Sequence, residues 1–262
     1  MKYCFILLLF IAPASFAQKW DVEVMGGVAA YNGDLTEHTI SYRSAGPSAG
    51  INVKYNFSNE IVVLRGGLTW GKISGDDKFN KQGDLKNRNL SFQTNIWEAS
   101  LCAELNIFEP EYYTVYPYVF AGIGAFRFNP YTYDNQQVKQ YLQPLGTEGQ
   151  GLASHPDRKP YSLTQFCLPF GGGMKVKLNT RWDLIYEVGG RLLFTDYLDD
   201  VSTTYVNSQE LMANSKPKAV ELAYRQSNSP YPGDGATRGN PKVKDWYFIS
   251  GFKLLFRLGQ DR

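Results

Sequence analysis

The segment Trp182–Phe194, WDLIYEVGGRLLF, alternates apolar and polar side chains with a period of two. A strand turns successive side chains to opposite faces, so this period predicts a β-strand. The apolar face carries Trp182, Leu184, Tyr186, Val188, Leu192 and Phe194, and the polar face carries Asp183, Glu187 and Arg191. Because full charges oppose large apolar side chains, we expect the apolar face to meet lipid and the charges to face the interior of a barrel.

The same alternation recurs along the chain, in segments near residues 20–31, 51–57, 62–70, 97–106, 116–128, 166–178 and 246–258. In the first segment, the predicted lipid face carries Trp20, Val22, Val24, Val28 and Ala30. The segment 116–128 has apolar residues on both faces, so its facing stays open. The sequence predicts an all-β, transmembrane, antiparallel up-and-down β-barrel of about eight strands, which is the smallest common size.

The lengths of the joints between these segments predict an orientation. Short joints lie near Ser58, Pro110 and Thr180, and long joints lie around residues 32–44, 75–90, 129–164 and 197–242. Outer-membrane barrels have short periplasmic turns and longer extracellular loops. We therefore expect both ends of the barrel domain and the short turns in the periplasm, and the long loops outside the cell.

A soluble lipocalin-like barrel or a β-sandwich would also alternate, but either would keep its apolar face inside. Here the predicted inner face is charged, and an eight-stranded barrel has room only for its own side chains. We predict a plugged, salt-bridged lumen rather than a pore, with Asp21 and Glu23 near Lys253 and Arg257 where the first and last strands close. The predicted lumen charge network comprises Asp21, Glu23, Arg65, Glu98, Glu104, Asp183, Glu187, Arg191, Lys253 and Arg257.

The amino terminus has the layout of a cleaved secretory signal peptide. A basic start precedes an apolar run over residues 4–12 and small residues up to Ala17. The run is shorter than the roughly 20 residues of a spanning helix. We expect a signal peptide at residues 1–17 and one barrel domain at residues 18–262, reaching the cell outer membrane as a multi-pass protein after Sec-type export. Lipid attachment at Cys4 is the minor alternative.

Composition excludes several classes of function. Tyr 18, Phe 16, Trp 5 and Gly 25 supply the aromatics and glycines typical of membrane barrels, and a net charge of +2 does not indicate nucleic-acid binding. After cleavage only Cys102 and Cys167 remain, too few for a disulfide scaffold. They are expected as buried free thiols, although a pair is an alternative.

No string in the chain has the spacing of a catalytic, cofactor-binding or metal-binding motif, so none of these sites is predicted. His38 and His155 both fall in long loops. Asp196, Asp199 and Asp200 could hold a hard cation such as calcium, but they lack the looped ligand array of an EF-hand, and a solvated rim is the favoured interpretation. Residues 209–226 are rich in helix formers, which Pro217 interrupts. Whether such a helix rests on the barrel mouth or binds a partner stays open.

Four strings together resemble the PorG-like outer-membrane proteins: YNGDL at 31–35, PYVFAGIG at 117–124, Gly190-Arg191, and TDYLDDVS at 195–202. The resemblance implies a non-enzymatic integral subunit of the type IX protein secretion and gliding machinery. The implied partners are outer-membrane lipid and the periplasmic ring, which includes a lipoprotein, with no cofactor and no small-molecule substrate. The family-motif positions are Gly33, Asp34, Leu35, Asp196, Tyr197, Asp199 and Asp200.

Two other functions stay open. One is a stand-alone structural or adhesive outer-membrane barrel of the OmpA/OmpX type. The other is an outer-membrane enzyme working from the long loops, for which His38, His155 and the acidic run at 196–200 are the only candidates.

Overall fold

The computed structural model describes residues 19–36, 44–57, 60–79, 83–214, 216–226 and 229–259. The expected signal peptide, His38 and the turn residue Ser58 lie outside these ranges.

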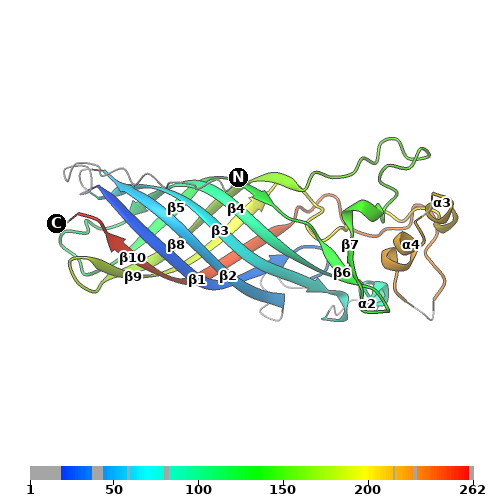
Figure 1. The fold of residues 1–262 in the computed structure, drawn as a ribbon, viewed down its shortest axis with the longest axis horizontal. Coiled ribbons are helices and arrows are strands. Elements are labelled where there is room, and N and C mark those ends of the chain that lie inside the picture. Colours follow the sequence, from blue (N-terminus) through cyan, green and yellow to red (C-terminus); the bar gives the residue numbers. More distant parts are fainter. Residues whose placement is uncertain are drawn as a thin grey trace, which may run out of the picture.

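Within the described ranges, eight long strands close into an antiparallel barrel. Each strand pairs with its neighbour in the chain, and β1 pairs with β10 to close the ring (Figure 1). The predicted up-and-down barrel of eight strands is confirmed. The strands are β1 Trp20–Asn32, β2 Ala45–Asn56, β3 Val62–Asp76, β4 Ser91–Asn106, β5 Val115–Arg127, β8 Thr164–Lys177, β9 Trp182–Leu193 and β10 Trp246–Arg257.

The barrel wall is apolar outside and polar inside, as the alternation predicts. Leu68, Trp97 and Phe252 are about 60% exposed, whereas the alternate positions on the same strands are buried. Strand β5, whose facing the sequence left open, turns Ile123 outward and Tyr118 inward. The inward face of β5 carries aromatic side chains instead of charges. Both faces of this strand are therefore apolar in the sequence, and the alternation could not show which one faces the lumen.

One predicted lipid-facing residue is buried. Ala30 has outward parity but is only 5% exposed. Its register partner on β10 is Phe248, and its chain neighbours Ala29 and Tyr31 belong to the buried core near the cap.

The connections alternate in length as predicted. The joints 57–61, 107–114 and 178–181 are short and lie at the barrel end where β1 begins and β10 ends. The long joint between β3 and β4 holds η2 Asp77–Phe79 and α2 Gly83–Arg88. No helix among the described residues is long and apolar enough to cross a membrane.

The two longest connections fold together beyond the other end of the barrel (Figure 1). We call the described residues of 128–163 and 194–245 the cap. The cap contains β6 Tyr131–Tyr133, β7 Lys139–Tyr141, η3 Gln143–Leu145, α3 Ser208–Ala213 and α4 Pro217–Ala223. Pro217 stands at the start of α4, so the helix-forming stretch at 209–226 becomes two short helices.

A hydrophobic core joins the cap to the barrel. Phe126 of β5 stacks on Phe128, Phe128 on Tyr161, and Tyr161 on Tyr197. Leu198 of the cap packs into the same cluster and is fully buried. Burial of these rings is the main apolar contribution that fixes the cap over the mouth.

Candidate functional site

The half of the lumen nearer the short turns is filled by ion pairs between side chains of different strands. Glu104 of β4 accepts from Lys54 of β2 at 3.1 Å, from Arg65 of β3 at 2.8 Å and from Lys175 of β8 at 2.8 Å. The same Arg65 nitrogen reaches Glu187 of β9 at 2.6 Å. These side chains are nearly inaccessible to solvent, so the carboxylates and cations satisfy each other rather than water.

A second layer lies closer to the cap. Arg191 Nε donates to Glu98 at 2.9 Å, and the Tyr247 hydroxyl donates to the same carboxylate at 2.6 Å. The void beside Glu98, Tyr247 and Thr69 has no room for a water molecule. The structure therefore places the predicted charges in a plugged lumen.

The closure of the barrel brings the four predicted residues together. Lys253 binds Glu23 at 3.0 Å, as expected. Arg257 stands opposite Asp21 in the β1–β10 register, as expected, and also forms an ion pair with Asp183 of β9, at 2.5 Å. Asp21 accepts from Asn56 of β2 at 2.7 Å. An inward side chain can reach either neighbouring strand, and register alone does not decide which.

The predicted network omitted several lumen residues that bind its members. Lys54, Lys175 and Tyr118 are buried among its members, and Tyr118 donates to Glu187 at 2.5 Å. The two lysines share the parity of the charges that were named, so the signal was present in the sequence. Tyr118 could not be assigned to the lumen, because the sequence did not show which face of β5 points inward.

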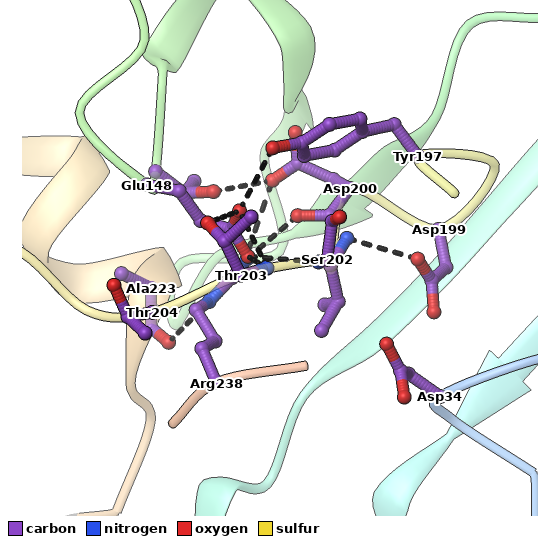
Figure 2. Close-up of polar contacts among 12 residues, drawn as sticks. Asp34, Glu148, Tyr197, Asp199, Asp200, Ser202, Thr203, Thr204, Ala223 and Arg238 are labelled. Atoms are coloured by element: carbon purple, nitrogen blue, oxygen red, sulfur yellow. Dashed lines mark hydrogen bonds and ion pairs between the residues drawn. The ribbon is translucent and has the colours of Figure 1, made fainter. Parts of the chain in front are cut away.

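A second polar assembly lies at the junction of barrel and cap, and we call it the mouth cluster (Figure 2). Its members come from the β1–β2 connection and from both halves of the cap, and all but the partly exposed Asp34 and Tyr197 are buried. The mouth cluster comprises Asp34, Glu148, Asp196, Tyr197, Asp199, Asp200, Arg238 and Asp245.

Glu148 and Arg238 form the centre of the mouth cluster. Arg238 donates to the Glu148 carboxylate at 2.9 Å and to the backbone oxygen of Asp200 at 2.6 Å. Glu148 also accepts the backbone N–H groups of Ser202 and Thr203, at 2.9 and 3.0 Å (Figure 2). One carboxylate from the first half of the cap thus holds the backbone of the second half.

The three aspartates of the run 196–200 have separate partners. Asp199 accepts from the Tyr31 hydroxyl of β1 at 2.5 Å, Asp200 from Thr147 at 2.6 Å, and Asp196 from Ser202 at 2.8 Å. Burial raises the pKa of Asp196 to about 7 and that of Asp200 to about 6. Burial, with Asp34 nearby, raises the pKa of Asp199 well above its usual range.

The Gly33-Asp34-Leu35 string meets this run from the barrel side. A side chain at Gly33 would collide with the Tyr31 ring and the Asp245 carboxylate, so the close approach of these groups requires glycine. The Asp34 carboxylate accepts the backbone N–H of Asn240 at 3.0 Å, and Leu35 is buried in the core. Two of the four strings that carry the family resemblance are therefore parts of one assembly.

Sequence reasoning missed several residues of this region. Glu148, Arg238 and Asp245 gave no periodic or motif signal, because they lie in irregular connections. Arg88, which binds Asp77 at 2.8 Å and donates to the Asp34 backbone oxygen at 2.9 Å, was missed for the same reason. The favoured interpretation of Asp196, Asp199 and Asp200 as a solvated rim is wrong, because all three are buried at the junction of cap and barrel.

The described residues contain no group of three or more His, Cys, Asp or Glu side chains arranged to hold a metal ion. His155 lies 3.5 Å from Glu210 of α3. Cys102 and Cys167 are buried free thiols. They stand on β4 and β8, with β5 between them, and two strand spacings of about 4.8 Å exceed the Cα separation of a disulfide.

Solved structures with a similar fold include outer-membrane proteins. The Neisserial surface protein A has 10% sequence identity and a TM-score of 0.46, over 91% of this chain and 96% of that chain. OprG of Pseudomonas aeruginosa has 11% identity and a TM-score of 0.40, over 92% and 97%. A major outer membrane protein of Thermus thermophilus has 12% identity and a TM-score of 0.42, over 90% and 98%.

The search among curated proteins found no match to the sequence. One family matches residues 1–214, which is most of the chain, and its description is a domain of unknown function, DUF6089. The chain belongs to the DUF6089 family.

Proposed function

We propose that this protein is a non-enzymatic barrel of the outer membrane that acts through its two ends and not through its lumen. The observation that carries the proposal is the inversion of the wall: apolar side chains such as Leu68, Ile123 and Phe252 cover the outside, and ion pairs fill the inside. In water such a wall would expose an apolar surface around the whole barrel, whereas lipid covers it at no cost. A plugged lumen leaves the cap and the short turns as the surfaces available to partners.

Fractionation of cells that express the tagged protein tests this placement. We expect the protein in the outer-membrane fraction, extractable only with detergent. Ile123→Arg, which puts a charge on the lipid face, is expected to reduce the assembled fraction strongly, because an arginine at the membrane midplane costs about 2–4 kcal/mol. Glu109→Arg at an exposed turn is the matched control. Recovery of the wild-type protein in the soluble fraction would refute the proposal.

We further propose that the membrane-anchored barrel serves the type IX secretion machinery. The support is the resemblance of the Gly33–Leu35 and Asp196–Asp200 strings to the PorG-like proteins, together with their assembly into one buried cluster. The end with the short turns offers a contact surface for a periplasmic ring. There Tyr112 is 72% exposed, and Phe108 packs on Tyr113 with 5.0 Å between ring centroids.

Mass spectrometry of what copurifies with the tagged protein in mild detergent tests the secretion role. We expect a periplasmic ring lipoprotein in the eluate, and loss of that lipoprotein with Tyr112→Ser. The matched control is Tyr133→Ser, which changes an exposed tyrosine at the opposite end. Recovery of the barrel alone would contradict the secretion role.

A stand-alone structural or adhesive barrel is the second candidate, and the folded cap favours it. The cap is fixed by ion pairs such as Arg238–Glu148 and by a continuous core, as a presented surface requires. A deletion strain that secretes normally but loses adhesion or envelope integrity would support this candidate over the secretion role.

A further inference from the structure

A polar groove lies on the outer wall of the barrel where β3 and β4 emerge toward the cap. Its volume is about 390 Å³, within the range of small-molecule sites. Ser74, Asp76, Ser91 and Gln93 lie along the groove. Ser74 and Asp76 lie on the same outward face of β3 as Trp70, and Ser91 and Gln93 lie on the same outward face of β4 as Trp97. This face is polar near the cap and apolar toward the short turns.

The height of the groove follows from the strand register. Trp70 and Trp97 are register partners on β3 and β4, and tryptophans favour the membrane interface. From Trp97 to Gln93 the strand rises about 13 Å at roughly 3.3 Å per residue, or about 10 Å along the membrane normal at the usual tilt. If the tryptophans mark the interface, the groove opens sideways at the level of lipid headgroups.

One cation of the groove has no carboxylate partner among the described residues. Arg225, which follows α4, donates to Ser91 Oγ at 3.2 Å, to Thr132 Oγ1 at 3.4 Å and to the Tyr133 backbone oxygen at 3.0 Å. Every acceptor is neutral, so these hydrogen bonds orient the guanidinium without neutralising it. The other charges cancel, because Lys78 binds Asp76 at 2.7 Å.

The rest of the lining suits a sugar. Tyr133 is 40% exposed and offers an aromatic surface, while serine hydroxyls and glutamine amides supply donors and acceptors. A guanidinium recognises phosphate through paired N–H groups. We propose that the groove binds a phosphorylated sugar, and that its source is the headgroup of the outer-leaflet glycolipid beside the barrel.

The glycolipid source of the ligand rests on the proposed outer-membrane placement. The binding test uses purified protein and does not depend on that placement. The full mature chain in detergent is titrated calorimetrically with glucose 1-phosphate, glucose, lipopolysaccharide, and the lipid-free phosphorylated core oligosaccharide. We expect the phosphorylated probes to bind and glucose to bind at least about tenfold more weakly. Tighter binding of lipopolysaccharide than of its oligosaccharide supports the glycolipid as the source. Binding of the free phosphorylated sugars without lipopolysaccharide binding would overturn that source.

Variants decide whether this groove is the site. Arg225→Gln is expected to weaken binding of the phosphorylated probes about tenfold, and Tyr133→Ser several-fold, while Lys242→Gln, an exposed cation of the cap outside the groove, leaves binding unchanged. Limited proteolysis shows whether Arg225→Gln keeps its cap. If it does not, Tyr133→Ser and Gln93→Ala decide, and unchanged binding in both overturns the proposal. The proposal is also overturned if no phosphorylated probe binds, or if Lys242→Gln weakens binding as much as Arg225→Gln does. Both outcomes count against it wherever the protein is found by cell fractionation.

Discussion

The lumen and the mouth cluster are both buried and polar, but their charges are balanced differently. The described lumen buries six carboxylates and six cations: Asp21, Glu23, Glu98, Glu104, Asp183 and Glu187 with Lys54, Arg65, Lys175, Arg191, Lys253 and Arg257. The mouth cluster gathers the carboxylates of Asp34, Glu148, Asp196, Asp199, Asp200 and Asp245 around Arg238. The lumen is neutral by pairing, whereas the mouth cluster is acidic.

This difference implies different energetics. Paired charges inside a closed barrel neutralise each other, so the lumen is a plug whose net charge is close to zero. Buried carboxylates in excess are stable when some are protonated, so docking of the cap depends on pH. Substitutions in each region should therefore give different responses.

The largest effect is expected from Glu104→Ala in the lumen. The variant leaves Lys54, Arg65 and Lys175 without their shared carboxylate, and breaking a buried pair costs about 3–5 kcal/mol. Urea unfolding in detergent, followed by tryptophan fluorescence, measures the free energy of unfolding. Glu109→Ala at an exposed turn is expected to change it by less than about 0.5 kcal/mol. Equal effects of the two variants would show that the lumen pairs do not stabilise the barrel.

The lumen could be predicted from the sequence and the mouth cluster could not, for a physical reason. Strand parity assigns Asp183 and Glu187 to one face before any partner is known. The contact of Asp199 with Tyr31, by contrast, depends on how a long connection folds back over the barrel, and no local period encodes that. The Gly33–Leu35 and Asp196–Asp200 strings marked positions that matter, but not that they meet.

A second large effect is expected from Arg238→Ala, this time in the cap alone. The variant leaves Glu148 and Asp200 buried without their guanidinium, and we expect cap docking to weaken by about 3 kcal/mol while the barrel stays folded. Hydrogen exchange resolved by segment measures this as faster exchange in residues 194–245 than in the barrel strands. Lys242→Ala is the control. Uniformly faster exchange would mean that cap and barrel unfold as one unit.

The pH dependence of cap docking sharpens the comparison further. Burial raises the pKa of Asp200 to about 6, although Arg238 opposes the shift, and burial raises that of Asp196, which faces Asp34, Lys244 and Glu148, to about 7. Because the folded pKa exceeds the unfolded value near 4, docking is strongest in acid and weakens as pH rises through 6 to 7.

Cap exchange measured from pH 5 to pH 8 should therefore accelerate by at least about tenfold more than exchange in the barrel strands, after correction for intrinsic rates. Asp196→Asn is expected to remove part of this dependence, because an amide does not ionise. A cap whose relative protection is constant over this range would contradict the acidic character of the mouth cluster.

The smallest effects come from removing one tyrosine hydroxyl in each region. Tyr31 donates to Asp199 at the mouth, and Tyr247 donates to Glu98 in the lumen, where Arg191 also binds the carboxylate. Each phenylalanine variant is expected to cost about 1–2 kcal/mol, because it removes one donor from a buried carboxylate. Tyr247→Phe should lower the free energy of unfolding of the whole barrel, whereas Tyr31→Phe should speed exchange in the cap alone.

The effect of Tyr31→Phe should also shrink in acid, since the raised pKa of Asp199 lets that carboxyl gain a proton and lose its need for a donor. The effect of Tyr247→Phe should not change over the same range, because Arg191 keeps Glu98 paired in the lumen. If the two variants respond to pH alike, the mouth cluster and the lumen are one electrostatic unit despite their different balance of charge.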